Sequence, residues 1–111
     1  MSAEHLLFAF TNPVEGHDDE FNKWYDGVHV PELLAIPGVV SAQRFEVAAP
    51  DGAPAPAHRY LAVYQLDRAG SEVMGELGAR MGSGELHMSD SLDIATASLS
   101  VWNSRGPEQT A

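Results

Sequence analysis

One short stretch of this sequence gathers several side chains that can exchange protons. The stretch FNKWYDGVHVPELLAIPG, residues 21–38, holds His29, Tyr25, Asp26 and Glu32. An unperturbed imidazole titrates near neutral pH, so His29 is suited to act as a general acid or base. Tyr25 lies four residues earlier and therefore on the same face of a helix. Its hydroxyl could donate a hydrogen bond to a carbonyl or enolate oxygen.

These residues leave two interpretations of His29 open. In one, it is a structural histidine at a helix end, bonded to a carbonyl or to Glu32. In the other, it works in a pocket, and Asp26 or Glu32, each three residues away, fixes its tautomer. A carboxylate neighbour would raise the pKa of His29 by favouring the charged form, whereas burial would lower that pKa. The basicity of His29 therefore depends on which effect is larger.

Six further residues are secondary candidates for the same pocket. They are His5 as a third catalytic residue, and Trp24, His58, Tyr60, Tyr64 and His87 as substrate-binding residues. His5 and His58 begin predicted strands, where such residues are often only solvated strand ends. Tyr60 and Tyr64 share the side of His58 along the strand, so they line the pocket if that side faces a partner subunit. Trp24 has the spacing of a core aromatic residue, which is its other interpretation.

The sequence contains no metal-binding or nucleotide-binding motif. Its five histidines are scattered without an HxxxH or HxH pair, and it has no cysteine, so we predict no bound transition metal. GxGxxG, P-loop and GxSxG motifs do not occur, which argues against nucleotide cofactors and serine hydrolase chemistry. We therefore expect no cofactor.

The composition is that of a small acidic globular domain. The chain has 111 residues, 16 acidic and 6 basic side chains, and a formal net charge of −10. This charge repels phosphate backbones and anionic membrane surfaces, so neither nucleic acid nor a membrane is an expected partner. The first ten residues lack a basic region, and their apolar run is too short for a signal peptide or a membrane span. We expect one cytoplasmic domain over residues 1–111, ordered over about 4–103.

The elements that must position these side chains follow the order strand, helix, strand, strand, helix, strand. Strands are predicted at 5–10, 39–48, 58–66 and about 93–102, and helices from about 19 and from 71 to 81. Asp18 or Asp19 is expected to cap the first helix, which Pro31 either ends or extends by a short turn, and Ser71 to cap the second. This order predicts a ferredoxin-like βαββαβ fold of the α+β class, a four-stranded antiparallel sheet with both helices on one face.

The second predicted helix has two glycines in its interior. Gly75 and Gly78 each cost roughly 1 kcal/mol relative to alanine in a helix. We expect close packing of another element to explain them. Met74, Leu77 and Met81 share one face of this helix with Gly78.

Both faces of the predicted sheet are apolar. The first strand has Leu6, Phe8 and Phe10 on one side and Leu7 and Ala9 on the other. A sheet with one face open to water should alternate apolar and polar residues. Two helices can cover only one face, so we expect a second copy of the chain to cover the other in a homodimer.

Residues 21–45, FNKWYDGVHVPELLAIPGVVSAQRF, resemble the EthD-like branch of the dimeric α+β barrel superfamily. Those proteins carry a Trp and a His-x-Pro near the end of the first helix, followed by an Ile-Pro-Gly turn into the second strand. The resemblance extends in topology over roughly 5–102. It implies two ferredoxin-like protomers with their sheets face to face and a pocket for a small organic molecule. A weaker likeness to plant polyketide cyclases of this superfamily rests on a histidine ahead of the first strand, here His5, and a histidine after the second helix, here His87.

On this resemblance, we expect an enzyme that acts without a cofactor on a small, largely apolar, oxygenated molecule, polyketide-like or aromatic. The chemistry would be acid/base catalysis by a cyclase, isomerase or lyase, with His29 as the acid or base and Tyr25 as a donor to the developing oxyanion. One alternative is a cofactor-free or haem-dependent monooxygenase of the same fold. The other is a non-catalytic protein that binds a small molecule.

Overall fold

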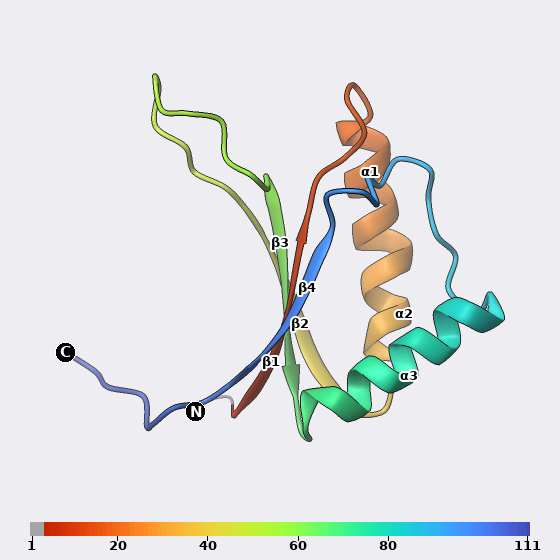
Figure 1. Cartoon of the computed structure of the whole chain (residues 1–111), viewed down its shortest axis with the longest axis vertical. Helices are drawn as coiled ribbons and strands as arrows, with labels where there is room; N and C mark the ends of the chain where they lie inside the picture. The colour runs from red at the N-terminus through yellow and green to blue at the C-terminus, as the bar shows by residue number, and fades with distance from the viewer. Residues whose placement is uncertain (1–3) are drawn as a thin grey trace.

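A computed structural model describes residues 4–111 and has the predicted ferredoxin-like arrangement (Figure 1). The strands are β1 (His5–Thr11), β2 (Val39–Glu46), β3 (Tyr60–Leu66) and β4 (Ser98–Asn103). They form one antiparallel sheet in the order β2-β3-β1-β4. The helical segments are α1 (Asp18–Trp24), η1 (Tyr25–His29), α2 (Val30–Leu34) and α3 (Gly70–Ser83). No helix in the described part of the chain is long and apolar enough to cross a membrane.

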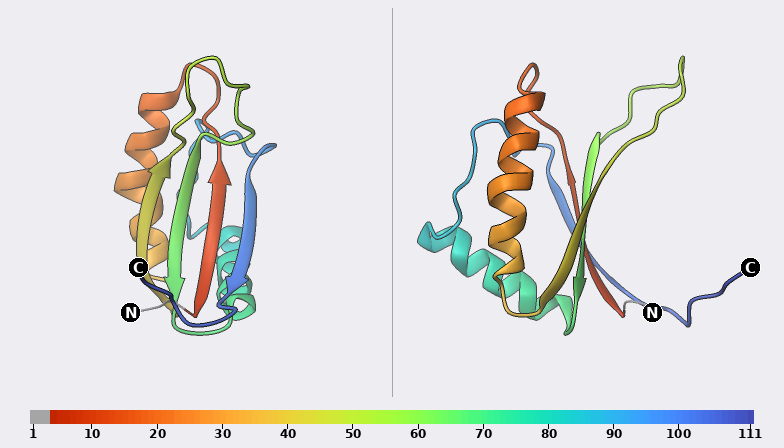
Figure 2. Two further views of the ribbon diagram at one scale, coloured as in Figure 1. Left: turned by 90° about the vertical axis from the view of Figure 1, so that its left-hand side faces the viewer. Right: turned by 180° about the vertical axis from the view of Figure 1, so that it is seen from behind.

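All helices lie on one face of the sheet (Figure 2). The buried core fills the space between these layers. The antiparallel pairing of β1 with β3 sets Leu7 opposite Tyr64 and Ala9 opposite Ala62, and all four side chains belong to this core. Phe21 and Tyr25 contribute the buried face of the first helix, while Trp24 packs partly buried against the same cluster. The strand alternation predicted from the sequence therefore places one apolar face of the sheet against the helices.

The first helix is continuous through Pro31, with a π-helical turn at its centre. The η1 turn spans Tyr25–His29, and the N–H of Val30 donates to the carbonyl of Tyr25. Pro31 follows at once in the first turn of α2, and its missing N–H removes one regular helical hydrogen bond. The expected cap by Asp18 or Asp19 is wrong, because both lie inside the first turn and His17 holds the capping position without a side-chain bond to the helix backbone.

Other boundaries also differ from the prediction. Ser71 does not cap α3, because the helix begins one residue earlier with Ala69 in the capping position, and it extends to Ser83. Its buried residues are Val73 and Leu77, whereas Met81 is exposed. The last strand begins at 98, because residues 93–97 form turns in which Asp93 accepts hydrogen bonds from Thr96.

The sheet face away from the helices carries an apolar cluster that is partly exposed. Phe8 lies at its centre in ring contact with Phe10 and Trp102, and Trp102 is 55% exposed. Phe45 on β2 is exposed as well. The connection between β2 and β3 and the C-terminal tail both project to this side of the sheet (Figure 2).

Close packing of α3 occurs at Gly70 and not at Gly75 or Gly78. A Cβ atom on Gly70 would lie 2.0 Å from Cγ1 of Val101 in β4, whereas a Cβ on Gly75 or Gly78 would meet nothing within 4 Å. The expectation of close packing at Gly75 and Gly78 is therefore wrong. The close approach lies at Gly70, at the start of the helix.

This packing predicts opposite effects for alanine at two glycines of one helix. Gly70→Ala should lower the free energy of unfolding by about 1–3 kcal/mol, because the new methyl group overlaps Val101. Gly75→Ala should raise it by up to about 1 kcal/mol through helix propensity alone. Urea denaturation of both variants measures the difference, and equal effects would contradict the packing described.

Candidate functional site

A cavity of about 230 Å³ lies between the sheet and the helices. Its wall consists of Leu7, Ala9, Thr11, Tyr25, His29, Leu33, Tyr64, Leu77, Met81, Met88, Leu92, Ile94, Ala97 and Leu99. The wall contains no Asp, Glu, Lys or Arg. Four side chains supply its polar atoms, namely Thr11, Tyr25, His29 and Tyr64. A largely apolar cavity with a few polar groups is the usual form of a small-molecule site.

The π turn brings His29 to the cavity wall beside two aromatic rings. Its imidazole stacks on Trp24 at 4.7 Å between ring centroids and meets Tyr25 edge-on at 4.9 Å. Its Nδ1 atom is buried and has no hydrogen-bond partner within residues 4–111. π turns are frequent at functional sites because they re-aim side chains within a helix. This one holds both Tyr25 and His29.

Burial determines the protonation state of His29. Burial lowers its pKa to about 4, outweighing the opposing charge of Glu32, and Arg44 lowers it further. The two candidate carboxylates are engaged elsewhere. Asp26 pairs with Arg44 at 2.9 Å, and Glu32 accepts hydrogen bonds from His87. His29 is therefore a neutral imidazole at neutral pH.

Tyr25 and Tyr64 remain protonated for the same reason. Burial raises the pKa of Tyr25, and the neighbouring Tyr64 and Arg44 oppose this only in part. Burial raises the pKa of Tyr64 as well, with a further rise from the neighbouring Tyr25. The hydroxyl of Tyr64 is buried beside the Tyr25 side chain. Both hydroxyls can thus donate to an oxygen that develops negative charge.

Thr11 is a polar residue of the wall that sequence reasoning missed. It is 4% exposed, and its Oγ1 has no hydrogen-bond partner among the described residues. It lies at the end of β1 on the side of Leu7 and Ala9, which face the helices. The alternation of β1, extended by one residue beyond the predicted boundary at 10, would have placed it there.

The connection after α3 is fastened over the cavity by His87. Its backbone N–H and its ring Nδ1 bond to the carboxylate of Glu32, at 2.9 Å and 2.6 Å, and Trp24 Nε1 donates to its carbonyl at 2.6 Å. Burial pushes the pKa of Glu32 upward, but the bonds from His87 outweigh this and hold it below its ordinary value. His87, whose side chain is 80% exposed, thus anchors the connection that carries Met88. His87 and Trp24 were predicted to bind substrate, and neither is on the cavity wall.

Three other predicted residues lie outside the cavity. His5 bonds to Asn103 at the far end of β1. His58 precedes β3, which begins at Tyr60, so it does not follow the alternation of the strand. Its ring lies tilted against that of Phe10, with 5.5 Å between ring centroids. Tyr60 is buried on the helix side but does not line the cavity. The side of β3 that carries Tyr60 and Tyr64 faces the helices, so Tyr64 reaches the cavity from within one protomer.

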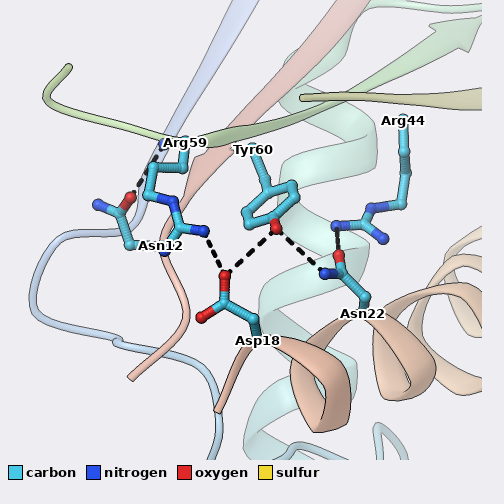
Figure 3. Close-up of polar contacts among 6 residues, drawn as sticks. All are labelled: Asn12, Asp18, Asn22, Arg44, Arg59 and Tyr60. Carbon is cyan, nitrogen blue, oxygen red and sulfur yellow. Dashed lines mark hydrogen bonds and ion pairs between the residues drawn. The ribbon is translucent and has the colours of Figure 1, made fainter. Parts of the chain in front are cut away.

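Tyr60 belongs to a polar network that fixes the first helix on the sheet (Figure 3). Its hydroxyl donates to Asp18, which also accepts from Arg59, and accepts from Asn22 at 3.2 Å. Arg44 donates to Asn22 at 2.8 Å, and its guanidinium lies 4.3 Å from the centre of the Tyr25 ring. These contacts tie α1 to β2 and β3 directly before the π turn.

The described residues include no group of three or more His, Asp or Glu side chains that could hold a metal ion. The prediction of no bound transition metal stays a prediction.

Solved structures with the same fold are found at low sequence identity, whereas no family model and no curated protein matches the sequence. The haem-degrading protein MhuD of Mycobacterium tuberculosis, with two haems bound in its active site, has a TM-score of 0.65 at 13% identity, covering 95% of this chain and 99% of that one. An EthD family protein of Bacillus halodurans has a TM-score of 0.55 at 15% identity, covering 97% and 100%. An EthD-like protein of Ralstonia eutropha has a TM-score of 0.58 at 21% identity, covering 92% and 93%.

These comparisons confirm the fold class. The chain is a ferredoxin-like α+β protein with the fold of the dimeric α+β barrels. The resemblance to EthD-like proteins is confirmed at the level of fold.

The low pKa of His29 predicts a pH dependence of stability. Its pKa is about 4 in the folded chain and 6.5 ordinarily, so the unfolded chain binds more protons between these values. The neutral His29 ring therefore makes its full contribution to the free energy of unfolding above pH 6.5, and this contribution is lost as the pH falls toward 4. In His29→Gln, the rise in the free energy of unfolding across this range should be smaller by up to about 3 kcal/mol.

Urea denaturation at intervals of pH on both proteins measures this difference, since all other titrating groups are shared. An identical pH dependence in the two proteins would contradict the burial of the His29 ring.

Proposed function

We propose that this protein is a cofactor-independent enzyme that transforms a small, largely apolar, oxygenated molecule by acid/base catalysis. One observation carries the proposal. His29, whose imidazole is neutral, and Tyr25 and Tyr64, whose hydroxyls stay protonated, line the same apolar cavity. A proton acceptor and a donor to an oxyanion are the two groups that enolate chemistry requires.

His29 acts as the base in this proposal. Its neutral ring accepts a proton from the substrate, and the negative charge left behind moves to a substrate oxygen that accepts a hydrogen bond from Tyr64 or Tyr25. Return of the proton to another atom completes an isomerisation, and attack or elimination by the enolate gives a cyclisation or a lyase reaction. Because a base of low pKa removes only relatively acidic protons with ease, a C–H group beside carbonyls or a phenolic O–H suits this site.

The cavity argues against the alternative of a haem enzyme. MhuD holds two haems in its active site, but the cavity of this chain, at about 230 Å³, is below the roughly 300 Å³ at which pockets for drug-sized ligands begin. Its wall offers no Lys or Arg to pair with the carboxylates of haem, and unpaired buried carboxylates are costly. The size of the cavity and the absence of cationic side chains on its wall do not fit that group, although His29 is of a type that can bind haem iron.

The proposed form of the enzyme is a homodimer through the sheet face that carries Phe8, Phe45 and Trp102. A second copy covers the apolar surface that two helices cannot reach.

Sedimentation at micromolar concentration should give about twice the 11.9 kDa of one chain. Phe8→Glu should yield monomers, because it buries an unpaired charge at the centre of that face. Leu34→Glu, at an exposed apolar residue on the helix side, should stay dimeric, and a monomeric wild-type protein would refute this form.

Replacement of His29 tests the proposed reaction. His29→Ala should lower turnover at least about tenfold through loss of the base, and His29→Gln somewhat less if hydrogen bonding is part of the role. His58→Gln is the matched control, because that ring lies outside the cavity, and it should leave turnover unchanged. Deuterium uptake from D₂O into small ketones and phenols, followed by NMR, measures the proton transfer.

Equal turnover of His29→Ala and wild type would remove His29 from the reaction. Binding of these compounds by the wild-type protein without any turnover would favour the non-catalytic alternative.

A further inference from the structure

The wall of the cavity has a buried inner part and an exposed outer part. The exposed residues of the wall are all apolar, and we call them the rim: Met81, Met88, Ile94, Ala97 and Leu99. The four large side chains among them are between 41% and 70% exposed. The cavity therefore meets solvent at an apolar surface.

The direction of α3 explains why the rim is exposed. Leu99 of β4 lies opposite Ala9 of the core and so on the helix side of the sheet. α3 lies close to β4 at Gly70, but its C-terminal end, which carries Met81, lies away from the sheet (Figure 1 and Figure 2). Leu99 and Met81 consequently stay partly uncovered on opposite sides of the opening.

The rim is continuous with the cavity that holds His29. Exposed apolar patches on a protein surface usually mark a binding site. The second copy of the chain is proposed for the other face of the sheet, which carries Phe8 and Trp102. The rim residues instead line the same cavity as His29, so a molecule in the cavity meets them where it reaches solvent. This continuity favours a ligand over a protein as the occupant of the rim.

The side chains of the rim suit an apolar chain. None of them carries a charge, a hydroxyl or an amide, so a polar substituent would lose its hydration there without gaining a partner. An apolar substituent gains free energy by leaving water. Met81 and Met88 are unbranched and adapt their shape to what they contact.

The volume of the cavity requires a longer substituent to leave it across the rim. An engineered cavity of about 150 Å³ in another protein binds benzene. The cavity of about 230 Å³ therefore holds about one ring with small substituents.

We infer that the substrate is a ketone or phenol that carries an apolar alkyl chain, with its oxygen-bearing end at His29 and its chain across the rim. This inference rests on the proposed function. It adds the alkyl chain of the substrate and makes the rim residues determinants of specificity.

Calorimetric titration with a series of alkyl phenyl ketones tests the inference. Acetophenone, butyrophenone and hexanophenone share one head and differ only in chain length. A fully buried methylene strengthens binding about fourfold. The rim covers a chain on one side only, so we expect about twofold for each added methylene, and at least about tenfold from acetophenone to hexanophenone.

Two rim residues are replaced by glutamine, which places a polar group where the chain would lie. The double variant Met88→Gln with Ile94→Gln should reduce the gain from acetophenone to hexanophenone to below about threefold and leave the affinity for acetophenone within about twofold. Leu34→Gln is the matched control, because Leu34 is 42% exposed, as Met88 is 41% exposed, but lies outside the cavity wall. It should keep the full gain.

Urea denaturation and sedimentation of each variant show that it folds and keeps the oligomeric state of the wild type. The single variant Ile94→Gln, at the most exposed of the large rim residues, gives the same comparison if the double variant does not fold.

The outcomes separate this inference from the proposed function. Failure of every ketone to bind would overturn both. Binding that does not strengthen with chain length, or an equal gain in the rim variants and the wild type, would overturn the inference alone. A change of oligomeric state in the rim variants would make the rim a protein contact and overturn it as well. A chain-length gain that the rim variants lose, without deuterium uptake into any ketone, would keep the rim as a binding site and overturn only the proposed catalysis.

Discussion

The contact of the His29 ring with Trp24 and Tyr25 is the interaction on which the site depends. Two aromatic neighbours cover much of the partly buried imidazole, and the loss of hydration lowers its pKa more than the charge of Glu32 raises it. A charged His29 would be a donor, whereas the neutral ring can accept a proton. The same exclusion of water raises the pKa of Tyr64 and keeps its hydroxyl a donor. Burial alone thus creates an acceptor and a donor in one cavity.

The charged groups around the cavity pair with one another outside its wall. Arg44 bonds to Asp26 and Asn22 behind the Tyr25 ring, and Glu32 receives its bonds from His87 on the outer side of the helix. These pairs hold the helix to the sheet and the connection after α3 to the helix, so they position the cavity without charging it. The separation matters because a charge on the wall would change the pKa of His29 and admit a different class of ligand.

The fold could be predicted from the sequence because its signals are local. Strand alternation and the helical spacing of Phe21, Trp24 and Tyr25 lead to the observed topology, and the density of proton-exchanging groups at residues 25–32 leads to His29.

The errors lie where tertiary contacts override local pattern. His58 leaves the alternation because β3 begins at Tyr60, and Gly70 rather than Gly75 or Gly78 faces Val101. Thr11 resembled a polar residue that ends a strand, and only the packing of the helices over it reveals its burial. The pKa of His29 depends on whether burial or a neighbouring carboxylate has the larger effect. The fold decides this as well, because Asp26 pairs with Arg44.

Direct titration of the His29 ring tests the central claim. NMR of the imidazole carbon-bound protons from mildly alkaline pH to about 4 follows all five histidines of the chain, and the spectrum of His29→Gln assigns the resonance of interest. We expect His29 to stay neutral through the physiological range and to reach half protonation only near pH 4. A midpoint for His29 near its ordinary value of 6.5 would contradict the account, because the ring would then be hydrated and outside the environment that makes it a proton acceptor in an apolar cavity.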